Sequence, residues 1–133
     1  MQTLTVGGFA LSADTLGSRA TAIGYAALNA QNFTTATDSN NTAVGYYAGV
    51  AVTTGTKNTF VGGEAGSNIT TGTQNVYVGY APSGSAVGNA REIVIGNGVG
   101  AGSNTARFIT TTGSATLNID GSDTSWAAAS DSR

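Results

Sequence analysis

Branched apolar residues followed by glycine recur along this chain at a nearly constant interval. Five segments share this ending: RATAIG (19–24), NTAVG (41–45), NTFVG (58–62), NVYVG (75–79) and EIVIG (92–96). The glycines that close the last four segments lie seventeen residues apart, at Gly45, Gly62, Gly79 and Gly96. A sequence that repeats itself at a fixed period is typical of architectures in which similar units stack on one another.

The first interval is longer, because Gly24 and Gly45 lie twenty-one residues apart. A second landmark locates the difference: FTTAT, VTTGT and ITTGT begin at Phe33, Val52 and Ile69. Aligning these three segments places two additional residues before the landmark in the first copy and two after it. Insertions in a repeat unit belong in turns, so turns are expected on both sides of the landmark.

Apolar residues alternate within each copy with the period of a β-strand. The residue directly before each repeat glycine is expected to face the interior; these residues are Ile23, Val44, Val61, Val78 and Ile95. Each unit is then a strand, a turn, a second strand and a turn back. Because one unit cannot bury its apolar face alone, we expect the units to stack about 4.8 Å apart with equivalent strands paired in parallel. The predicted fold is all-β: a parallel β-solenoid of the β-roll type, left-handed, with about five coils.

Small residues at fixed repeat positions indicate sharp corners and close contacts. The repeat glycines, together with Gly49 and Gly66, are expected to allow positive φ and the close approach of another backbone. Alanines follow three positions after the repeat glycine, at Ala27, Ala48 and Ala65. We expect these alanines to form a flat contact face and infer, largely by analogy, a homotrimer around a common axis. Such a trimer would also protect the end coils, whose strand edges are otherwise unpaired.

Composition argues against most catalytic and nucleic-acid functions. Charged residues make up 9% of the chain, the formal net charge is −2, and there is no histidine or cysteine. The chain therefore has no basic footprint for nucleic acid, no thiolate and no imidazole. Glu64 and Glu92 occupy different repeat positions, so paired carboxylates for glycoside cleavage are not expected. We expect no enzymatic activity, no cofactor and no metal site. The N-terminal segment has no basic start and contains Gly7 and Gly8, so no membrane insertion is expected.

The repeats resemble those of known attachment proteins. The pattern NTAVGYYAG…TTGTKNTFVGGEAG looks like repeats in tail-fibre and adhesin head segments of bacteriophages, and it is similar to trimeric autotransporter adhesin heads. The resemblance covers residues 19–104, so residues 1–18 are expected to be an N-terminal cap or attachment segment. It implies a structural, host-attachment component of a virion appendage, located in the virion and without chemistry of its own. The implied partners are other virion proteins and a host surface glycan or envelope protein.

A second resemblance concerns residues 105–133, which are expected to form a C-terminal neck. The segment ARFITTTGSATLNIDGSDTSWAAASDSR resembles the neck that leads, in many phage fibres, into a self-cleaving intramolecular chaperone of the peptidase S74 type. Ser130, Asp131 and Arg133 match the opening of that chaperone. The resemblance implies a chaperone body after Arg133, which this sequence does not contain, and we assign no catalysis to Ser130.

Aromatic residues are the candidates for a binding surface. Tyr25, Tyr46 and Tyr80 directly follow a repeat glycine, whereas Phe60 and Tyr77 precede the inward valine and are expected to point outward. Aromatic faces with a polar edge suit sugar rings, and repetition suits multivalent binding. The alternative is that these rings pack between subunits or cover a thin core.

Threonines support a different class of function. The pairs Thr35 and Thr37, Thr54 and Thr56, and Thr71 and Thr73 recur at one place in three successive copies. A flat stacked array of this kind resembles the ice-binding face of some antifreeze solenoids, although a turn built from threonine, glycine and asparagine accounts for it equally well. Ice binding and a role as a bacterial surface adhesin are the alternative functions.

Overall fold

The described part of the chain is built from strands and turns. The computed structural model describes residues 2–119 and 127–128, and these residues contain no helix. Accordingly, no helix in this part of the chain is long and apolar enough to cross a membrane. The strands are β1 (Leu4–Val6), β2 (Gly17–Ser18), β3 (Thr21–Ile23), β4 (Thr37–Asp38), β5 (Thr42–Val44), β6 (Thr59–Val61), β7 (Val76–Val78), β8 (Ile93–Gly96), β9 (Thr105–Ile109), β10 (Ser114–Asn118) and β11 (Ala127–Ala128).

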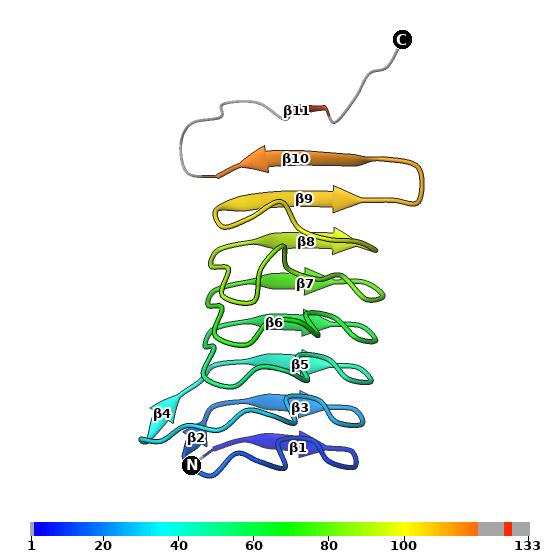
Figure 1. The fold of residues 1–133 in the computed structure, drawn as a ribbon. Helices are drawn as coiled ribbons and strands as arrows, with labels where there is room; N and C mark the ends of the chain where they lie inside the picture. The colour runs from blue at the N-terminus through cyan, green and yellow to red at the C-terminus, as the bar shows by residue number, and fades with distance from the viewer. Residues whose placement is uncertain (1, 120–126, 129–133) are drawn as a thin grey trace.

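Equivalent strands stack into one sheet along the length of the molecule. The sheet has nine strands in the order β1-β3-β5-β6-β7-β8-β9-β10-β11, and β2 and β4 form a separate pair beside the first coils (Figure 1). Pairing from β1 to β9 is parallel, and Val44 lies opposite Val61, which lies opposite Val78. The seven parallel strands delimit about six turns, which confirms the parallel β-solenoid and its register.

The stack begins earlier than residue 19 and continues past residue 104. Leu4 pairs with Thr21 and Val6 with Ile23, so residues of the expected N-terminal cap form a coil of the same kind. At the other end β9 is still parallel to β8, but β10 turns back and pairs antiparallel to β9 (Figure 1). This hairpin covers the last parallel edge, which would otherwise present unpaired backbone groups.

The prediction of which strand residues face inward is wrong. In β3, β5, β6, β7 and β8 the residue two places before the repeat glycine is fully buried; these residues are Ala22, Ala43, Phe60, Tyr77 and Val94. The residues before the repeat glycines lie on the outer face, where Val61 and Ile95 are each 37% exposed. The expected outward orientation of Phe60 and Tyr77 is therefore wrong as well. Alternation determines which residues share a face, but it does not determine which of the two faces is inside.

Side-chain size on the opposite wall explains how the large rings fit inside. A Cβ placed on Gly49 would lie 2.7 Å from the Phe60 ring, and one placed on Gly66 would overlap the same ring. The coil of Gly24 carries Leu28 at the position equivalent to Gly49 and Ala22 at the position equivalent to Phe60. Volume is thus exchanged between two walls of the same interior, as close packing requires.

The alanines three positions after the repeat glycine are also interior residues. Ala27, Ala48 and Ala65 are fully buried and belong to the apolar core. They cannot form the flat contact face on which the inference of a trimer was based. In the same turn, the expected positive φ is confirmed at Gly49 (60°) and Gly66 (63°), and Leu28 adopts a similar φ of 50° at the equivalent position.

The repeat glycines form a column in which neighbouring backbones approach closely. Their φ angles are strongly positive, for example 124° at Gly62 and 135° at Gly79. A Cβ added to Gly45 would lie 2.6 Å from the carbonyl carbon of Gly62, and the other members of the column meet the next coil in the same way. Glycine is required here both by conformation and by space.

The four extra residues of the long repeat are confined to one corner. Asn32 N–H donates to Thr53 carbonyl oxygen across an offset of twenty-one residues, as Thr53 N–H donates to Thr70 across seventeen. From Ser39 onward the offset has returned to that of the other coils, because Lys57 N–H donates to Ser39 and Gln74 N–H donates to Thr56. The predicted division of the insertion into two pairs is therefore wrong, and all four residues lie between Asn32 and Ser39, in the segment that contains β4.

Candidate functional site

A ladder of buried asparagines lines one side of the interior. Asn41, Asn58 and Asn75 are fully buried and stand at the first position of three successive repeat segments. Asn41 Oδ1 accepts a hydrogen bond from Asn58 N–H at 2.9 Å, and Asn58 Oδ1 accepts one from Asn75 N–H at 3.0 Å. Each Nδ2 also donates to a backbone carbonyl oxygen fourteen residues further along the chain, at 2.7 to 2.8 Å. The acceptors are Gly55, Gly72 and Asn89. The ladder joins neighbouring coils through side chains, in addition to the sheet.

Glu92 takes the place of asparagine in the last repeat segment and completes this network. Its N–H donates to Asn75 Oδ1 at 2.9 Å. Its buried carboxylate accepts from Tyr77 Oη at 2.7 Å, from Asn89 Nδ2 at 3.0 Å and from Gly102 N–H at 2.7 Å. These neutral donors satisfy the hydrogen-bonding capacity of the buried carboxyl group, as a buried polar group requires.

Tyr77 should make the stability of the protein sensitive to alkaline pH. Burial raises the pKa of Tyr77 well above its usual value, and the hydrogen bond to Glu92 and the charge of Glu92 act in the same direction. The folded state keeps a proton that the unfolded chain releases above about pH 10, so the stabilisation is complete below that pH and is lost as the pH rises further. We expect this residue to lower the free energy of unfolding by about 1.4 kcal/mol per pH unit above about pH 10.

Urea unfolding at about pH 8 and about pH 11 measures this effect. Tyr77→Phe should lower stability at the lower pH by roughly 1–3 kcal/mol, because Glu92 loses a donor, and should also flatten the alkaline decline. Tyr80→Phe is the matched control, since Tyr80 is exposed and should change neither quantity. An alkaline decline of equal slope in Tyr77→Phe and the unmodified protein would contradict the prediction.

Four aromatic side chains gather on the outer surface of the N-terminal coils, and we call them the aromatic surface. They are Phe9, Tyr25, Tyr46 and Tyr47. The Tyr25 and Tyr46 rings stack, with centroids 5.8 Å apart and planes 17° apart. Phe9 meets Tyr25 edge-on at 5.6 Å, and Tyr47 lies 4.4 Å from Tyr46. Desolvation and the neighbouring Tyr47 raise the pKa of Tyr46.

The five aromatic residues proposed from the sequence separate into three groups. Tyr25 and Tyr46, which are 45% and 55% exposed, belong to the aromatic surface. Tyr80 is exposed too, but the intervening coil carries Gly63 at the equivalent position, which separates it from the other rings. Phe60 and Tyr77 stack on each other inside the solenoid, with centroids 5.8 Å apart and planes 2° apart.

The sequence reasoning missed the other two members of the aromatic surface. Phe9 was not considered because its coil was not recognised as a repeat, although Val6-Gly7 shows the repeat ending and Gly7 precedes Gly24 by seventeen residues. Tyr47 lies two residues after its repeat glycine, where the first coil carries Phe9 and the neighbouring coils carry Ala26 and Glu64. Aligning the N-terminal coil would have identified Phe9.

Two hollows adjoin the aromatic surface and share Tyr47. The first, of about 210 Å³, is lined by Phe9, Tyr25, Ala26, Asn29 and Tyr47. The second, of about 230 Å³, is lined by Tyr46, Tyr47, Val50, Glu64 and Ser67. Each hollow thus combines aromatic rings with one or two polar side chains, a combination that is typical of sites for small amphipathic ligands.

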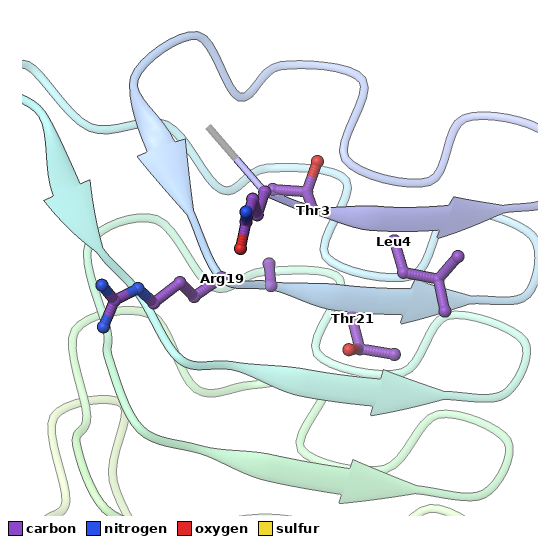
Figure 2. Close-up of a pocket in the computed structure, with 6 residues that line it drawn as sticks. Thr3, Leu4, Arg19 and Thr21 are labelled. Atoms are coloured by element: carbon purple, nitrogen blue, oxygen red, sulfur yellow. The ribbon is translucent and has the colours of Figure 1, made fainter.

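A further hollow of about 490 Å³ lies at the N-terminal end of the stack (Figure 2). It is lined by Gln2, Thr3, Leu4, Arg19, Ala20 and Thr21. Figure 2 shows the Arg19 side chain extending away from Leu4 and Thr21. Arg19 Nη1 pairs with Asp38 Oδ2 at 3.2 Å, so its charge is already partnered. We assign no ligand to this hollow.

The outer face of the parallel sheet carries an uninterrupted apolar column. It consists of the residues before the repeat glycines and their equivalents at both ends: Val6, Ile23, Val44, Val61, Val78, Ile95 and Phe108. All seven are exposed or half-buried. The neighbouring column contains threonine, valine, isoleucine, leucine and alanine, so neither column contains a charged residue. An apolar patch of this extent on an outer face is typical of a contact surface.

The threonine pairs lie away from this sheet. Thr35, Thr54 and Thr71 are exposed in bends, Thr37 begins β4, and Thr73 forms an isolated bridge with Ala90. They do not share one regular strand face, which a flat ice-binding array requires. Ice binding stays an untested alternative.

Two other expectations concern the C-terminal segment and relatives. Ser130, Asp131 and Arg133, which carry the resemblance to a chaperone junction, lie outside the described residues. Comparison of the chain with protein-family models, curated proteins and solved structures found no match.

Proposed function

We propose that the chain is a structural, host-attachment segment of a phage tail fibre or similar virion appendage, and that it assembles as a parallel homotrimer. The repeat resemblance motivates the assignment to an appendage. The observation that supports a trimer is the apolar column on the outer sheet face. We propose this column as the contact between subunits, in place of the alanines, which are buried.

Identical copies are the partners that this column fits best. Its side chains recur once per coil, about 4.8 Å apart, so a parallel copy in the same register presents an apolar residue at every level. Burying a half-exposed branched side chain contributes roughly 1 kcal/mol. The column contains six branched residues and Phe108, so each subunit repeats such a contribution at every level. Because neither column contains a charge, copies can approach without leaving a charge unpaired.

A trimer of such solenoids suits a mechanical and attachment role. Sheet pairing and the asparagine ladder join each coil to the next, whereas the apolar columns would join the subunits laterally. The resulting rod would present each surface feature three times, which strengthens binding to a repetitive host surface.

Val61→Glu tests the assembly. In a parallel trimer three glutamates would meet at one level of a desolvated contact, where juxtaposed like charges cost several kcal/mol. We expect the unmodified chain to have the mass of a trimer in analytical ultracentrifugation. The protein concentration at which half of the trimer has dissociated should be at least about a hundredfold higher for Val61→Glu than for the unmodified chain. Circular dichroism should remain that of a β-protein.

Thr54→Glu is the matched control, because Thr54 is exposed in a bend away from the sheet face. It should leave the trimer intact. A monomer at the highest soluble concentration of the unmodified chain, or equal dissociation of both variants, would refute assembly through this column.

A further inference from the structure

We propose that the aromatic surface binds a neutral oligosaccharide, with a pyranose ring in each of the two hollows that share Tyr47. The inference deepens the proposed function by naming the class of host receptor, and it relies on that function for its biological meaning. The binding event itself requires only this chain.

The first argument is the exposure of rings that the fold is able to bury. The interior accommodates Phe60 and Tyr77, yet Phe9, Tyr25 and Tyr46 remain 63%, 45% and 55% exposed. They are held in fixed geometry by their mutual ring contacts, so little ordering is needed when a ligand arrives. The face of a pyranose ring carries C–H groups while its edge carries hydroxyls, and an exposed tyrosine matches both parts.

The second argument is the kind of polar group beside the rings. Asn29 lines the first hollow, and its Nδ2 donates to the Phe9 carbonyl oxygen at 3.0 Å and to Ser12 Oγ at 2.6 Å. These bonds fix both the amide and the Phe9 segment. Glu64 and Ser67 line the second hollow, where a carboxylate is a strong acceptor for the hydroxyls of a sugar.

The third argument concerns charge and selects neutral sugars. Among the residues that the structure describes, Glu64 is the only charged one that lines either hollow. An acidic sugar or a phosphate would meet a like charge and no cation, whereas the hydroxyls of a neutral sugar would donate to the carboxylate.

The spacing of the hollows fits a short chain of sugars. The first hollow is bounded by residues of the first three coils and the second by residues of the third and fourth, with Tyr47 between them. One to two coil steps correspond to roughly 5–10 Å, so neighbouring or alternate rings of one oligosaccharide can occupy both hollows.

The experiment uses the full chain and an array of immobilised trisaccharides. Neutral probes are built from glucose, galactose or N-acetylglucosamine, and sialylated trisaccharides are the acidic probes. We expect at least one neutral trisaccharide and no sialylated one to be retained. Calorimetric titration with the retained trisaccharide should show affinity reduced by roughly three- to tenfold in Tyr25→Ser and in Tyr46→Ser.

Tyr80→Ser is the matched control. It removes an exposed tyrosine from the same repeat position, outside the aromatic surface, and should leave the affinity unchanged. Circular dichroism melting of each variant establishes that the coils remain folded. The inference is overturned if no neutral trisaccharide is retained, if only sialylated probes are retained, or if Tyr80→Ser weakens binding as much as the other two variants.

Sedimentation of the same samples separates this inference from the proposed assembly. A trimer that retains no trisaccharide contradicts the sugar site alone. A monomer that retains a neutral trisaccharide through Tyr25 and Tyr46 contradicts the trimer alone. If the serine variants lower the oligomeric mass and leave sugar affinity unchanged, the aromatic surface is a contact between copies of the chain and the sugar site is refuted.

Discussion

Gly62→Ala is expected to abolish the folded state or to destabilise it by more than about 4 kcal/mol, a large part of the roughly 5–15 kcal/mol that stabilises a typical domain. The alanine would have to adopt a φ of 124°, a conformation that is strained for any residue with a Cβ. Its Cβ would also overlap the carbonyl oxygen of Gly79 and lie 2.8 Å from the carbonyl carbon. Relieving the overlap would separate two coils in the middle of the stack and break the sheet there.

Gly113→Ala is the matched control, because a Cβ at Gly113 would meet nothing within 4 Å. It should change the free energy of unfolding by less than about 0.5 kcal/mol. Urea unfolding followed by circular dichroism measures both variants. Equal unfolding midpoints for Gly62→Ala and the unmodified protein would show that the coils do not approach as closely as the glycine column requires.

Asn58→Ala is expected to destabilise the protein by roughly 3–5 kcal/mol, because it removes the central member of the buried ladder. Asn75 N–H would lose its acceptor at 3.0 Å, and the Gly72 carbonyl oxygen would lose its donor at 2.8 Å. Both groups are buried between coils, and each unsatisfied buried group costs about 1–3 kcal/mol. A cavity the size of the missing amide adds to the loss.

Asn97→Ala is the control for Asn58→Ala, since Asn97 is an exposed asparagine in a bend. Its effect should stay within about 0.5 kcal/mol. Hydrogen exchange provides a local measurement, because the Asn75 amide should exchange faster in Asn58→Ala than expected from the loss of global stability. Unchanged urea unfolding in Asn58→Ala would mean that the ladder does not stabilise the stack.

The repeat glycines made the fold and its register predictable. Their constant interval requires equivalent residues to lie above one another, and the pairing of Val44 with Val61 and of Val61 with Val78 confirms this. The interior was not predictable from alternation alone, because the outer column of Val and Ile is as apolar as the inner one. The signal for which strand residues face inward was the matching of side-chain sizes across the interior. A large ring at Phe60 lies opposite Gly49, where a side chain would not fit.

The candidate site was only partly predictable for a related reason. Tyr25, Tyr46 and Tyr80 follow the repeat glycine, and all three are exposed, although their binding role is still a prediction. Tyr47 is equivalent to Phe9, so it was missed together with the N-terminal coil, because the neighbouring coils carry Ala26 and Glu64 at this position. The role of the buried asparagines was missed because asparagine at the start of a strand is read as a turn residue, and its interior position depends on the path of the whole coil.

The corner between Asn32 and Ser39 shows that this architecture separates what must be constant from what is free to vary. Four additional residues there leave the offset of the flanking coils, the glycine column and the asparagine ladder undisturbed, and the small β2-β4 pair stands to one side (Figure 1). Doubling the length of a loop costs only about 0.6 kcal/mol in closure entropy. Variation in length and sequence can therefore accumulate at this corner, while the spacing and pairing of the coils are inherited unchanged.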